Sequence, residues 1–256
     1  MIRVDNLTYR YTPEAPNILN GISLTIDEGT HVALLGPNGC GKTTLIKHLN
    51  ALLFPAAGSV HVDGMITTDT ASIREIRRRV GMVFQNPDSQ IVGMTVEEDV
   101  AFGPGNLALP SAEIRRRVDE CLAMVGMTGL EPRAPHTLSG GEKRLLAIAG
   151  VLAMAPRYIA FDEPTAYLDP AGKQRVLEII RMLHRKGMAI IHIAHDMRDI
   201  ADADRIAVMN QGGILIEGTP AEVFGQSDLL HSIGFACPTG DALPSGWPDF
   251  ARGHHD

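Results

Sequence analysis

The sequence has little of what would indicate a disulfide-stabilised or metal-bound scaffold. Only three of its 256 residues are cysteine, and Cys40, Cys121 and Cys237 lie far apart without the spacing of metal ligands. Small secreted folds need several closely spaced cysteines, and zinc sites need short repeated spacings. The cysteine pattern therefore excludes a disulfide framework and favours a reducing compartment.

Long apolar runs are also missing. The most apolar stretches, residues 145–155 and 188–194, are shorter than the ~20 residues that a membrane-spanning helix needs. The first residues lack the apolar segment of a secretory signal. We therefore expect a soluble or peripheral protein whose membrane contacts are made through protein partners.

A basic surface of the kind that binds nucleic acid is not indicated. The chain has 23 Lys and Arg residues against 30 Asp and Glu residues, a net charge of −7. Binding to nucleic acid needs clustered positive charge, because phosphates must be neutralised. The arginine-rich stretches at 73–80 and 114–118 look like solvated helix faces, so we expect no nucleic acid among the partners.

What the chain does contain is an alternation of strand-like and helix-like segments. This alternation argues for a largely parallel sheet covered by helices, and therefore for the α/β class. The expected strands are 2–9, 18–26, 30–35, 59–63, 80–84, 158–161, 188–193, 205–209 and 214–217, and the expected helices include 42–53, 72–79 and 172–186.

The segment from about residue 87 to 155 has a different character. We expect helices at 96–102 and 111–125, separated by the breakers Gly103-Pro104-Gly105, and a long apolar helix that begins near residue 139. We interpret this segment as an α-helical subdomain inserted into an α/β core.

The core and this insertion together form one domain over residues 1–225. Residues 226–256 contain three prolines and end in Gly-His-His-Asp. We expect them to form a loosely ordered C-terminal tail.

Residues 36–43, Gly-Pro-Asn-Gly-Cys-Gly-Lys-Thr, fit the pattern G-x-x-x-x-G-K-[ST] between an expected strand and an expected helix. The glycines allow backbone N–H groups to point at phosphate oxygens, and the positive end of the following helix strengthens the attraction. Lys42 can reach the β- and γ-phosphates, and the Thr43 hydroxyl can complete the oxygen shell of Mg²⁺. The predicted nucleotide-binding residues here are Gly36, Pro37, Asn38, Gly39, Cys40, Gly41, Lys42, Thr43 and Thr44, of which Cys40 occupies a freely varying position.

Residues 158–163, Tyr-Ile-Ala-Phe-Asp-Glu, predict an apolar strand that ends in two carboxylates. Ligands bind at this carboxyl edge in α/β sheets. We expect Asp162 to hold Mg²⁺ through water and Glu163 to polarise the attacking water as general base. Alone, the same residues could be an ordinary strand end and turn, but the phosphate-binding loop favours the catalytic interpretation.

A third motif, Leu-Ser-Gly-Gly-Glu at residues 138–142, precedes an expected helix. Ser139 is a natural N-cap, and the glycines leave backbone N–H groups open to an anion. With all three motifs, the chain resembles the ABC ATPase family over residues 1 to about 225.

The resemblance implies a phosphate-loop NTPase core with an antiparallel β subdomain and an inserted α-helical subdomain, using ATP and Mg²⁺. It also implies that the Ser139–Glu142 motif of one subunit closes on the γ-phosphate held by a second subunit. In this arrangement Ser139, Gly140, Gly141 and Glu142 contact nucleotide only in a dimer. Such a dimer would contain two composite sites.

Three further side chains are assigned through the resemblance. Tyr11 matches an aromatic ring against adenine, although a turn or core tyrosine is the alternative. Gln85 matches the glutamine that senses Mg²⁺ and water and links the core to the helical subdomain, and His195 matches the histidine that bonds the γ-phosphate. The expected catalytic residues are Lys42, Gln85, Glu163 and His195, and the expected Mg²⁺ residues are Thr43, Gln85 and Asp162.

One position departs from the family pattern. Leu168-Asp169 matches the loop that crosses the dimer interface, but Tyr167 stands where a small Gly or Ala is more usual. The packing at that point of the interface is therefore left open.

Three stretches, 84–91, 95–104 and 138–153, are similar to the ATPases of energy-coupling-factor importers. This narrower resemblance implies uptake of a transition-metal ion (cobalt or nickel) or a vitamin, at the cytoplasmic face of the cell membrane. The expected partners are a second ATPase subunit, identical or paralogous, a transmembrane coupling subunit and a substrate-binding membrane subunit. The acidic residues of this region, Asp88, Glu97, Glu98 and Asp99, either meet basic helices of that coupling subunit or form a solvated face.

Two other classes remain as alternatives. The ATPase of a conventional ABC importer or exporter would carry the same catalytic residues. A non-transport ABC ATPase is less well supported, because repair members need a long inserted coiled coil and translation members usually carry two ATPase domains. We expect the transported substrate to be selected by the separate membrane subunit rather than by this chain.

Overall fold

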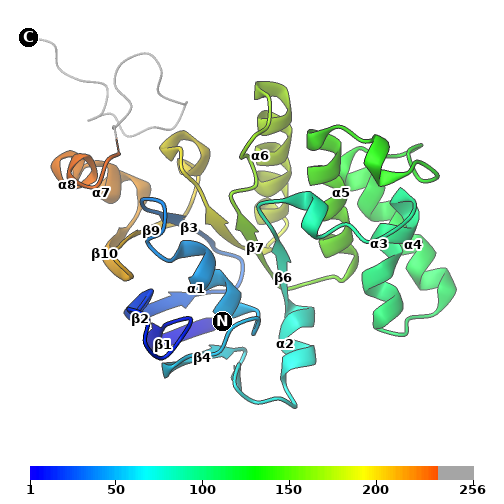
Figure 1. The fold of residues 1–256 in the computed structure, drawn as a ribbon. Helices are drawn as coiled ribbons and strands as arrows, with labels where there is room; N and C mark the ends of the chain where they lie inside the picture. Colours follow the sequence, from blue (N-terminus) through cyan, green and yellow to red (C-terminus); the bar gives the residue numbers. More distant parts are fainter. Residues whose placement is uncertain (236–256) are drawn as a thin grey trace, which may run out of the picture.

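The computed structural model describes residues 1–235, and two sheets organise it (Figure 1). The antiparallel sheet has the strand order β2-β1-β4-β5, and the larger sheet has the order β10-β9-β3-β8-β7-β6. In the larger sheet β9, β3, β8, β7 and β6 are mutually parallel, and only β10 runs antiparallel to its neighbour. The α/β class with a separate antiparallel sheet is confirmed.

The strands are β1 (Ile2–Tyr9), β2 (Leu19–Ile26), β3 (His31–Leu35), β4 (Ala57–Val62), β5 (Met65–Ile66), β6 (Val80–Val83), β7 (Tyr158–Asp162), β8 (Ala189–Ile193), β9 (Arg205–Asn210) and β10 (Gly213–Gly218). The α-helices are α1 (Lys42–Leu49), α2 (Ile73–Arg79), α3 (Val96–Asn106), α4 (Ser111–Val125), α5 (Gly140–Ala153), α6 (Pro170–Arg185), α7 (Pro220–Phe224) and α8 (Ser227–Ser232). Short 3₁₀ turns occur at Pro87–Ser89, Pro135–Thr137 and Met197–Ile200.

The three central strands determine where the site lies. Every residue of β3, β7 and β8 is buried, as expected for parallel strands covered on both faces. Ile193 at the end of β8 is opposite Leu34 of β3 and Asp162 of β7. The segments that follow the three strands therefore leave the sheet side by side at one edge.

Helices α3, α4 and α5 lie between β6 and β7 in the sequence and form a separate group beside the sheet, drawn in green in Figure 1. They pack around their own apolar cluster, in which Val100, Leu122 and Ile148 are fully buried. Val83, Ile159 and Phe161 from the sheet belong to the same cluster. The helical group is thus attached to the sheet through shared apolar packing rather than through loops alone.

The expected break in α3 at Gly103-Pro104-Gly105 is wrong, because the helix continues to Asn106. A Cβ on Gly103 would lie 2.5 Å from the sulfur of Met154, so this glycine allows α3 to pack closely on the end of α5. Pro104 lacks the N–H that would bond the Val100 carbonyl oxygen, but the helix extends only two residues beyond it, so the packing of α3 tolerates this loss. Tertiary packing has outweighed the local propensity.

Two other helix boundaries differ from the sequence expectation by two residues or more. Helix α1 ends at Leu49 rather than at residue 53, because Ala51 adopts a left-handed conformation with φ 56°. Helix α6 begins at Pro170 rather than at residue 172, because the Asp169 side chain caps it by accepting the Gly172 N–H.

The loosely ordered tail is wrong for its first ten residues. Helix α8 packs Leu230, which is fully buried, into an apolar cluster with Ile200 and Phe224. The rest of the expected tail, 236–256, lies outside the described residues, as does Cys237. Within residues 1–235, Cys40 and Cys121 are buried and unpaired, and no helix combines the length and apolarity of a bilayer span.

Two buried histidines lie in the central strands. The rings of His31 on β3 and His192 on β8 stack with centroids 5.7 Å apart, and neither ring nitrogen of His192 has a partner among the described residues. Burial is the largest cause that lowers the pKa of His31 to about 3, and the neighbouring His192 and His184 lower it further. Burial, together with the nearby charge of Lys173, also lowers the pKa of His192 to about 3. Both rings are therefore neutral in the folded protein at mildly acidic pH.

Because unfolded histidines titrate near pH 6.5, the unfolded chain binds protons that the folded chain does not once the pH falls below 6.5. The free energy of unfolding should therefore decrease as the pH is lowered from about 6.5 toward 3, by up to about 1.4 kcal/mol per pH unit for each buried histidine. We predict that in His192→Leu the free energy of unfolding depends less steeply on pH, by about 1.4 kcal/mol per pH unit, because one proton fewer is bound on unfolding. Urea unfolding at about pH 5, 6 and 7 measures this dependence. The exposed His231→Leu is the matched control, and parallel profiles for wild type and His192→Leu would contradict the prediction.

Candidate active site

A cavity of about 240 Å³ lies at the carboxyl edge of the central strands. It is bordered by the loop between β3 and α1, by Glu163 after β7, and by Tyr11 and Ile18 from the connection between β1 and β2. The structure thus brings together residues from three distant parts of the sequence. The predicted site residues that line this cavity are Tyr11, Asn38, Gly39, Gly41, Lys42, Thr43, Thr44 and Glu163.

The loop needs glycine where it bends toward neighbouring backbone. A Cβ on Gly36 would lie 2.3 Å from the Met209 carbonyl oxygen, and Gly41 has a left-handed φ of 107° directly before α1. At Gly39, by contrast, a Cβ would meet nothing within 4 Å inside this chain. The backbone at Gly39 is therefore open to the cavity.

Lys42 lies almost entirely within this loop. Its ammonium donates to the carbonyl oxygens of Gly36 at 2.6 Å and Pro37 at 3.0 Å, and the residue is only 5% exposed. Backbone N–H groups and a buried cation around one open curve form an anion-binding arrangement. Cys40 is also buried, and burial raises the pKa of its thiol, so it stays protonated at neutral pH.

Asp162 and Thr43 form the oxygen-rich part of the site. The Thr43 hydroxyl donates to Asp162 Oδ1 at 2.9 Å. Burial raises the pKa of Asp162, the Thr43 hydrogen bond opposes this, and the Glu163 carboxylate adds to it. A hydroxyl and a carboxylate are ligands that Mg²⁺ prefers, and a divalent cation here would offset the burial of the charge. These residues therefore fit the ion.

Glu163 is held between two side chains from different elements. Gln85, after β6, donates to Glu163 Oε2 at 2.6 Å, and the His195 Nε2 lies 2.5 Å from Glu163 Oε1. Glu163 itself has a left-handed φ of 47°, an uncommon conformation for glutamate that often marks functional positions. Both carboxylate oxygens are thus fixed in direction, which suits a group that must orient a water molecule.

Tyr11 borders the opposite side of the cavity. Its hydroxyl is 3.0 Å from the Thr44 hydroxyl, and its ring makes an edge contact with Tyr9 at a centroid distance of 5.2 Å. The residue is 56% exposed, so a ring face is free to stack with a planar ligand. The core-tyrosine alternative does not agree with this exposure.

Residues 139–142 lie in a separate hollow of about 480 Å³ that shares no lining residue with the first cavity. Ser139 caps α5 by accepting the Glu142 N–H, and Glu142 accepts the Ser139 N–H at 2.7 Å in return. The Cβ positions of Gly140 and Gly141 point into open space. The N-terminus of α5 is therefore exposed to solvent but separate from the phosphate-type loop of the same chain.

Two contributors were not found by sequence reasoning. Ile18 was interpreted only as the start of a strand, yet it lines the cavity. Arg144 was noted only as part of a motif, yet it is 2% exposed and donates from α5 to the carbonyl oxygens of Phe84 and Gln85. A cation at the fifth position of an otherwise apolar helix was the signal that could have indicated a buried partner.

The four acidic residues after Gln85 all have partners within the chain. Only Asp99 is buried, so the solvated-face interpretation is wrong for Asp99, whereas Asp88 and Glu98 remain exposed to solvent. Asp99 is buried and accepts the backbone N–H groups of Val92 and Gly93. The remaining contacts are Asp88 with Lys143 at 2.7 Å, Glu97 with Arg115 at 2.8 Å, and Glu98 with the backbone at Thr95. Exposed apolar side chains occupy this surface instead, namely Val92, Met94 and Phe102.

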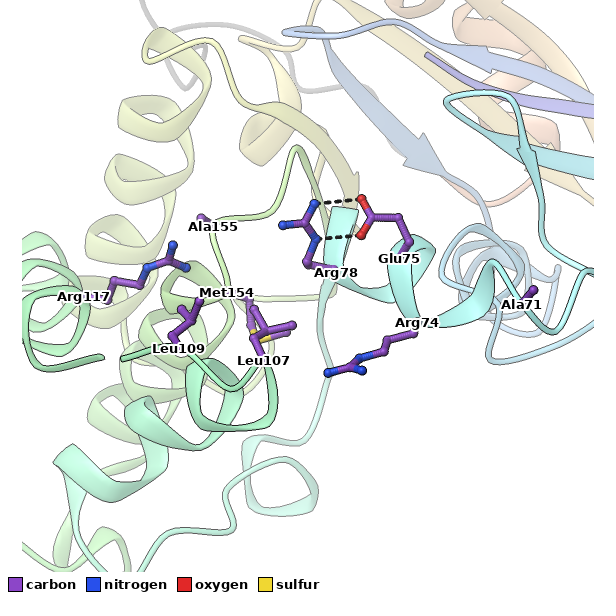
Figure 2. A pocket seen from close by; sticks show the side chains of 9 residues that line it. All are labelled: Ala71, Arg74, Glu75, Arg78, Leu107, Leu109, Arg117, Met154 and Ala155. Atoms are coloured by element: carbon purple, nitrogen blue, oxygen red, sulfur yellow. Dashed lines mark hydrogen bonds and ion pairs between the residues drawn. The ribbon is translucent and has the colours of Figure 1, made fainter. Parts of the chain in front are cut away.

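A further hollow of about 420 Å³ lies between α2 and the helical group (Figure 2). In Figure 2, Glu75 and Arg78 from α2 are joined by two hydrogen bonds, and Arg117 lies across the hollow on α4. Leu107, Leu109 and Met154 form its apolar part.

Comparison with known proteins identifies relatives along nearly the whole chain. The family model described as ABC transporter matches residues 19–166. A cobalt import ATP-binding protein, CbiO, of Syntrophus aciditrophicus is 57% identical over 95% of this chain and 87% of its own length. The energy-coupling factor transporter ATP-binding protein EcfA1 of Clostridium perfringens is 47% identical over 93% of this chain and 86% of its own length.

Solved structures agree with these relatives. The cbiO1 protein of Clostridium perfringens, described as part of the ABC transporter complex cbiONQ, superimposes with a TM-score of 0.81 at 36% identity, covering 91% of this chain and 93% of that one. A dimeric ATP-binding cassette in a post-hydrolysis state with ADP and Pi gives a TM-score of 0.77 at 30% identity, covering 86% and 99%.

The contacts of Arg144 generate a prediction for the segment that carries Gln85. A lysine at this position cannot bond two carbonyl oxygens in the forked geometry of a guanidinium. We expect Arg144→Lys to lose about 1.5 kcal/mol of local stability and to speed amide hydrogen exchange across residues 84–90 about tenfold. Arg77→Lys, an exposed arginine with a single bond to the Ala51 carbonyl, is the control. Unchanged exchange over 84–90 in Arg144→Lys would show that this contact does not hold the segment.

Proposed function

This chain belongs to the ABC transporter family, and we propose that it hydrolyses ATP at the carboxyl edge of β3, β7 and β8 to power the uptake of a transition-metal ion, specifically cobalt. Its place as the ATP-binding subunit of an energy-coupling-factor importer agrees with the sequence expectation. The observation that carries the proposed catalysis is the Glu163 carboxylate, fixed by Gln85 and His195 across the cavity from the Lys42 loop.

In the proposed reaction the loop holds the phosphates of ATP. Lys42 exchanges its bonds to the Gly36 and Pro37 carbonyl oxygens for phosphate oxygens, and its charge stabilises the transition state. Mg²⁺, when held by Thr43 and Asp162, supplies charge neutralisation. Tyr11 supports the adenine ring by stacking, which gives affinity with little discrimination.

Glu163 has the role of general base for the attacking water. Its two oxygens are directed by Gln85 on one side and His195 on the other, so the carboxylate is preorganised before the water arrives. His195 also has the role of bonding the γ-phosphate. Gln85 connects this chemistry to the helical group, because its carbonyl oxygen accepts a bond from Arg144 of α5.

The second half of each site comes from another ATPase subunit in this proposal. The exposed N-terminus of α5, with Ser139, Gly140, Gly141 and Glu142, lies in its own hollow and has no anion to bind within one chain. Facing a second copy, it completes the site at the other copy's γ-phosphate. The dimeric structural relative with ADP and Pi supports this arrangement.

We place the transmembrane coupling subunit over the surface after Gln85. Val92, Met94 and Phe102 are 59%, 80% and 56% exposed there, and the hollow in Figure 2 borders the same helical group. Because the four acidic residues are engaged within the chain, we expect this contact to be mainly apolar. Through it the protein is held at the cytoplasmic face of the cell membrane.

The substrate class is supported by the 57% identical relative, whose name is that of a cobalt import protein. The test is to co-express this chain with a tag and identify the membrane proteins that purify with it. A substrate-binding membrane protein that takes up Co²⁺, together with a separate coupling subunit, supports the proposal. A vitamin-binding membrane protein would replace the cobalt assignment, and a conventional permease would overturn the coupling-factor assignment.

Glu163→Gln provides the test of the catalytic assignment. We expect it to lower the kcat of ATP hydrolysis about 100-fold or more while ATP binding is retained, because only the proton-accepting group is lost. Phosphate release and fluorescent-ATP titration measure the two quantities. Glu178→Gln, an exposed carboxylate on α6, is the matched control. Equal kcat values for Glu163→Gln and wild type would remove Glu163 from the mechanism.

A further inference from the structure

Asp199 is a buried carboxylate that the proposed mechanism does not use. It lies in the 3₁₀ turn Met197–Ile200, four residues after His195, and its side chain is only 4% exposed. Acidic side chains are rarely buried to this degree unless a cation or hydrogen-bond donors compensate the charge. The partners of Asp199 therefore indicate why this charge is kept inside the protein.

Two partners reach Asp199 from the segment that follows β7. The Thr165 hydroxyl donates to Asp199 Oδ2 at 3.0 Å, and the Lys173 ammonium lies 2.8 Å from Oδ1. In the described part of the chain, Lys173 is the only cation that forms an ion pair with this carboxylate. Thr165 lies two residues after Glu163, and the Ala166 N–H donates to the Glu163 carbonyl oxygen in the same short turn. Asp199 is thus tied to the loop that carries Glu163.

Lys173 also holds the residue that directly follows His195. Its ammonium donates to Asp196 Oδ2 at 3.2 Å, so one cation bonds two carboxylates of the loop that carries His195. Burial raises the pKa of Asp199, the bond from Lys173 opposes this, and the nearby charge of Asp196 adds to it. Lys173 therefore offsets both the burial of one carboxylate and its repulsion by the other.

The place of Lys173 in α6 is unfavourable for a lysine by local rules. It is the fourth residue of the helix, near the positive end, where a carboxylate is favoured and a cation is repelled. The first turn of α6 contains no acidic residue that would offset this repulsion. The compensating charges come instead from Asp196 and Asp199, which belong to another segment. A lysine at this place therefore indicates a tertiary role rather than a contribution to the helix.

The bonds of Lys173 join two loops whose side chains meet in the site. His195 Nε2 lies 2.5 Å from Glu163 Oε1, although the two residues follow different strands. On one side of His195, the Ala194 N–H donates to a carbonyl oxygen of β3, and on the other side Asp196 is held by Lys173. A cross-link within a few residues of both side chains limits how far they can move apart, and small displacements of catalytic groups cost much of the rate.

We propose that Lys173 is a positioning residue for ATP hydrolysis, because its two ion pairs keep Glu163 and His195 at bonding distance. The inference rests on the proposed function, since it concerns the same carboxylate and the same attacking water. Lys173 does not line the nucleotide cavity, so it acts through other residues and touches no reacting atom. Loss of the cross-link misplaces the base but leaves the phosphate-type loop intact, so the effect falls on turnover rather than on affinity for ATP.

The experiment compares Lys173→Met, which keeps the length of the side chain without its charge, with Lys173→Arg, which keeps the charge and several donors. Phosphate release gives kcat, and fluorescent-ATP titration gives the dissociation constant of ATP. We expect Lys173→Met to lower kcat about tenfold or more and to change the dissociation constant less than about threefold. Lys173→Arg should keep kcat within about threefold of wild type.

Arg181→Met is the matched control. Arg181 lies on the same helix, pairs with Asp202 and has a side chain that is 34% exposed, compared with 32% for Lys173. It bonds neither of the loops that carry Glu163 and His195, so this variant should leave kcat and the dissociation constant of ATP unchanged. An equal loss of kcat in Arg181→Met and Lys173→Met would contradict a specific role of Lys173.

A double variant separates positioning from stability. Lys173→Met alone leaves Asp199 buried without a cation, which lowers the stability of the fold. Lys173→Met with Asp199→Asn removes that buried charge, and asparagine still accepts the Thr165 hydrogen bond. We expect the melting temperature to recover toward wild type while kcat stays low, since Asp196 is still not bonded to α6. Recovery of kcat together with the melting temperature would indicate a merely structural role and overturn the inference.

A second test asks whether Lys173 acts through His195. In the His195→Ala background there is no imidazole left to hold against Glu163, so Lys173→Met should lower kcat further by less than about twofold. A full tenfold further loss in that background would overturn the inference, as would an unchanged kcat in Lys173→Met alone. Equal kcat values for Glu163→Gln and wild type would instead count against the proposed function, which separates the two failures.

Discussion

The parallel pairing of β3, β8 and β7 is the constraint on which the rest of the site depends. Ile193 lies opposite both Leu34 and Asp162, so the three strands end in one row. The phosphate-type loop, the Asp162-Glu163 pair and His195 therefore leave the sheet as neighbours, although Thr43 and Asp162 are 119 residues apart in sequence and Glu163 and His195 are 32 apart. A shift of one strand by one residue would turn each of its side chains to the opposite face of the sheet and move the segment that follows it out of this row.

The same edge of the sheet carries two adjacent carboxylates, Asp162 and Glu163, in different environments. Asp162 is buried beside the Thr43 hydroxyl, whereas Glu163 one residue later is held in a left-handed turn by Gln85 and His195. The backbone change between the two carboxylates separates their directions, so Asp162 faces the Thr43 hydroxyl and Glu163 lies between Gln85 and His195. Burial of Asp162 and the two hydrogen bonds to Glu163 therefore give neighbouring carboxylates different environments.

Arg144 connects this chemistry to the helical group. Its side chain is buried and donates from α5 to the backbone of the segment that carries Gln85. Movement of α3–α5 must therefore displace that segment or break two charged hydrogen bonds. The apolar cluster shared with Val83 and Phe161 gives the same connection a second, non-polar component. A change of packing at the helical surface can therefore reach Glu163 through a short path.

Much of the fold and site could be predicted from the sequence because the signals were local. The loop at residues 36–43 has fixed spacing, the buried strands are continuous apolar runs, and α4 matched its predicted bounds because both of its ends carry strong boundary residues. The end of α1 at Leu49, before the left-handed Ala51, and the continuation of α3 through Pro104 could not be predicted. Both depend on packing against residues distant in sequence.

The sequence by itself determined the residue types and their order along the strands, and so the α/β class, the phosphate-type loop and the acids after β7. Only the tertiary structure decided which groups meet. It placed Gln85 and His195 on the two oxygens of Glu163, engaged the four acidic residues within the chain, and left Tyr167 outside. The physical reason is that a side chain's partner and exposure depend on which elements pack around it, and a linear pattern carries no such distances.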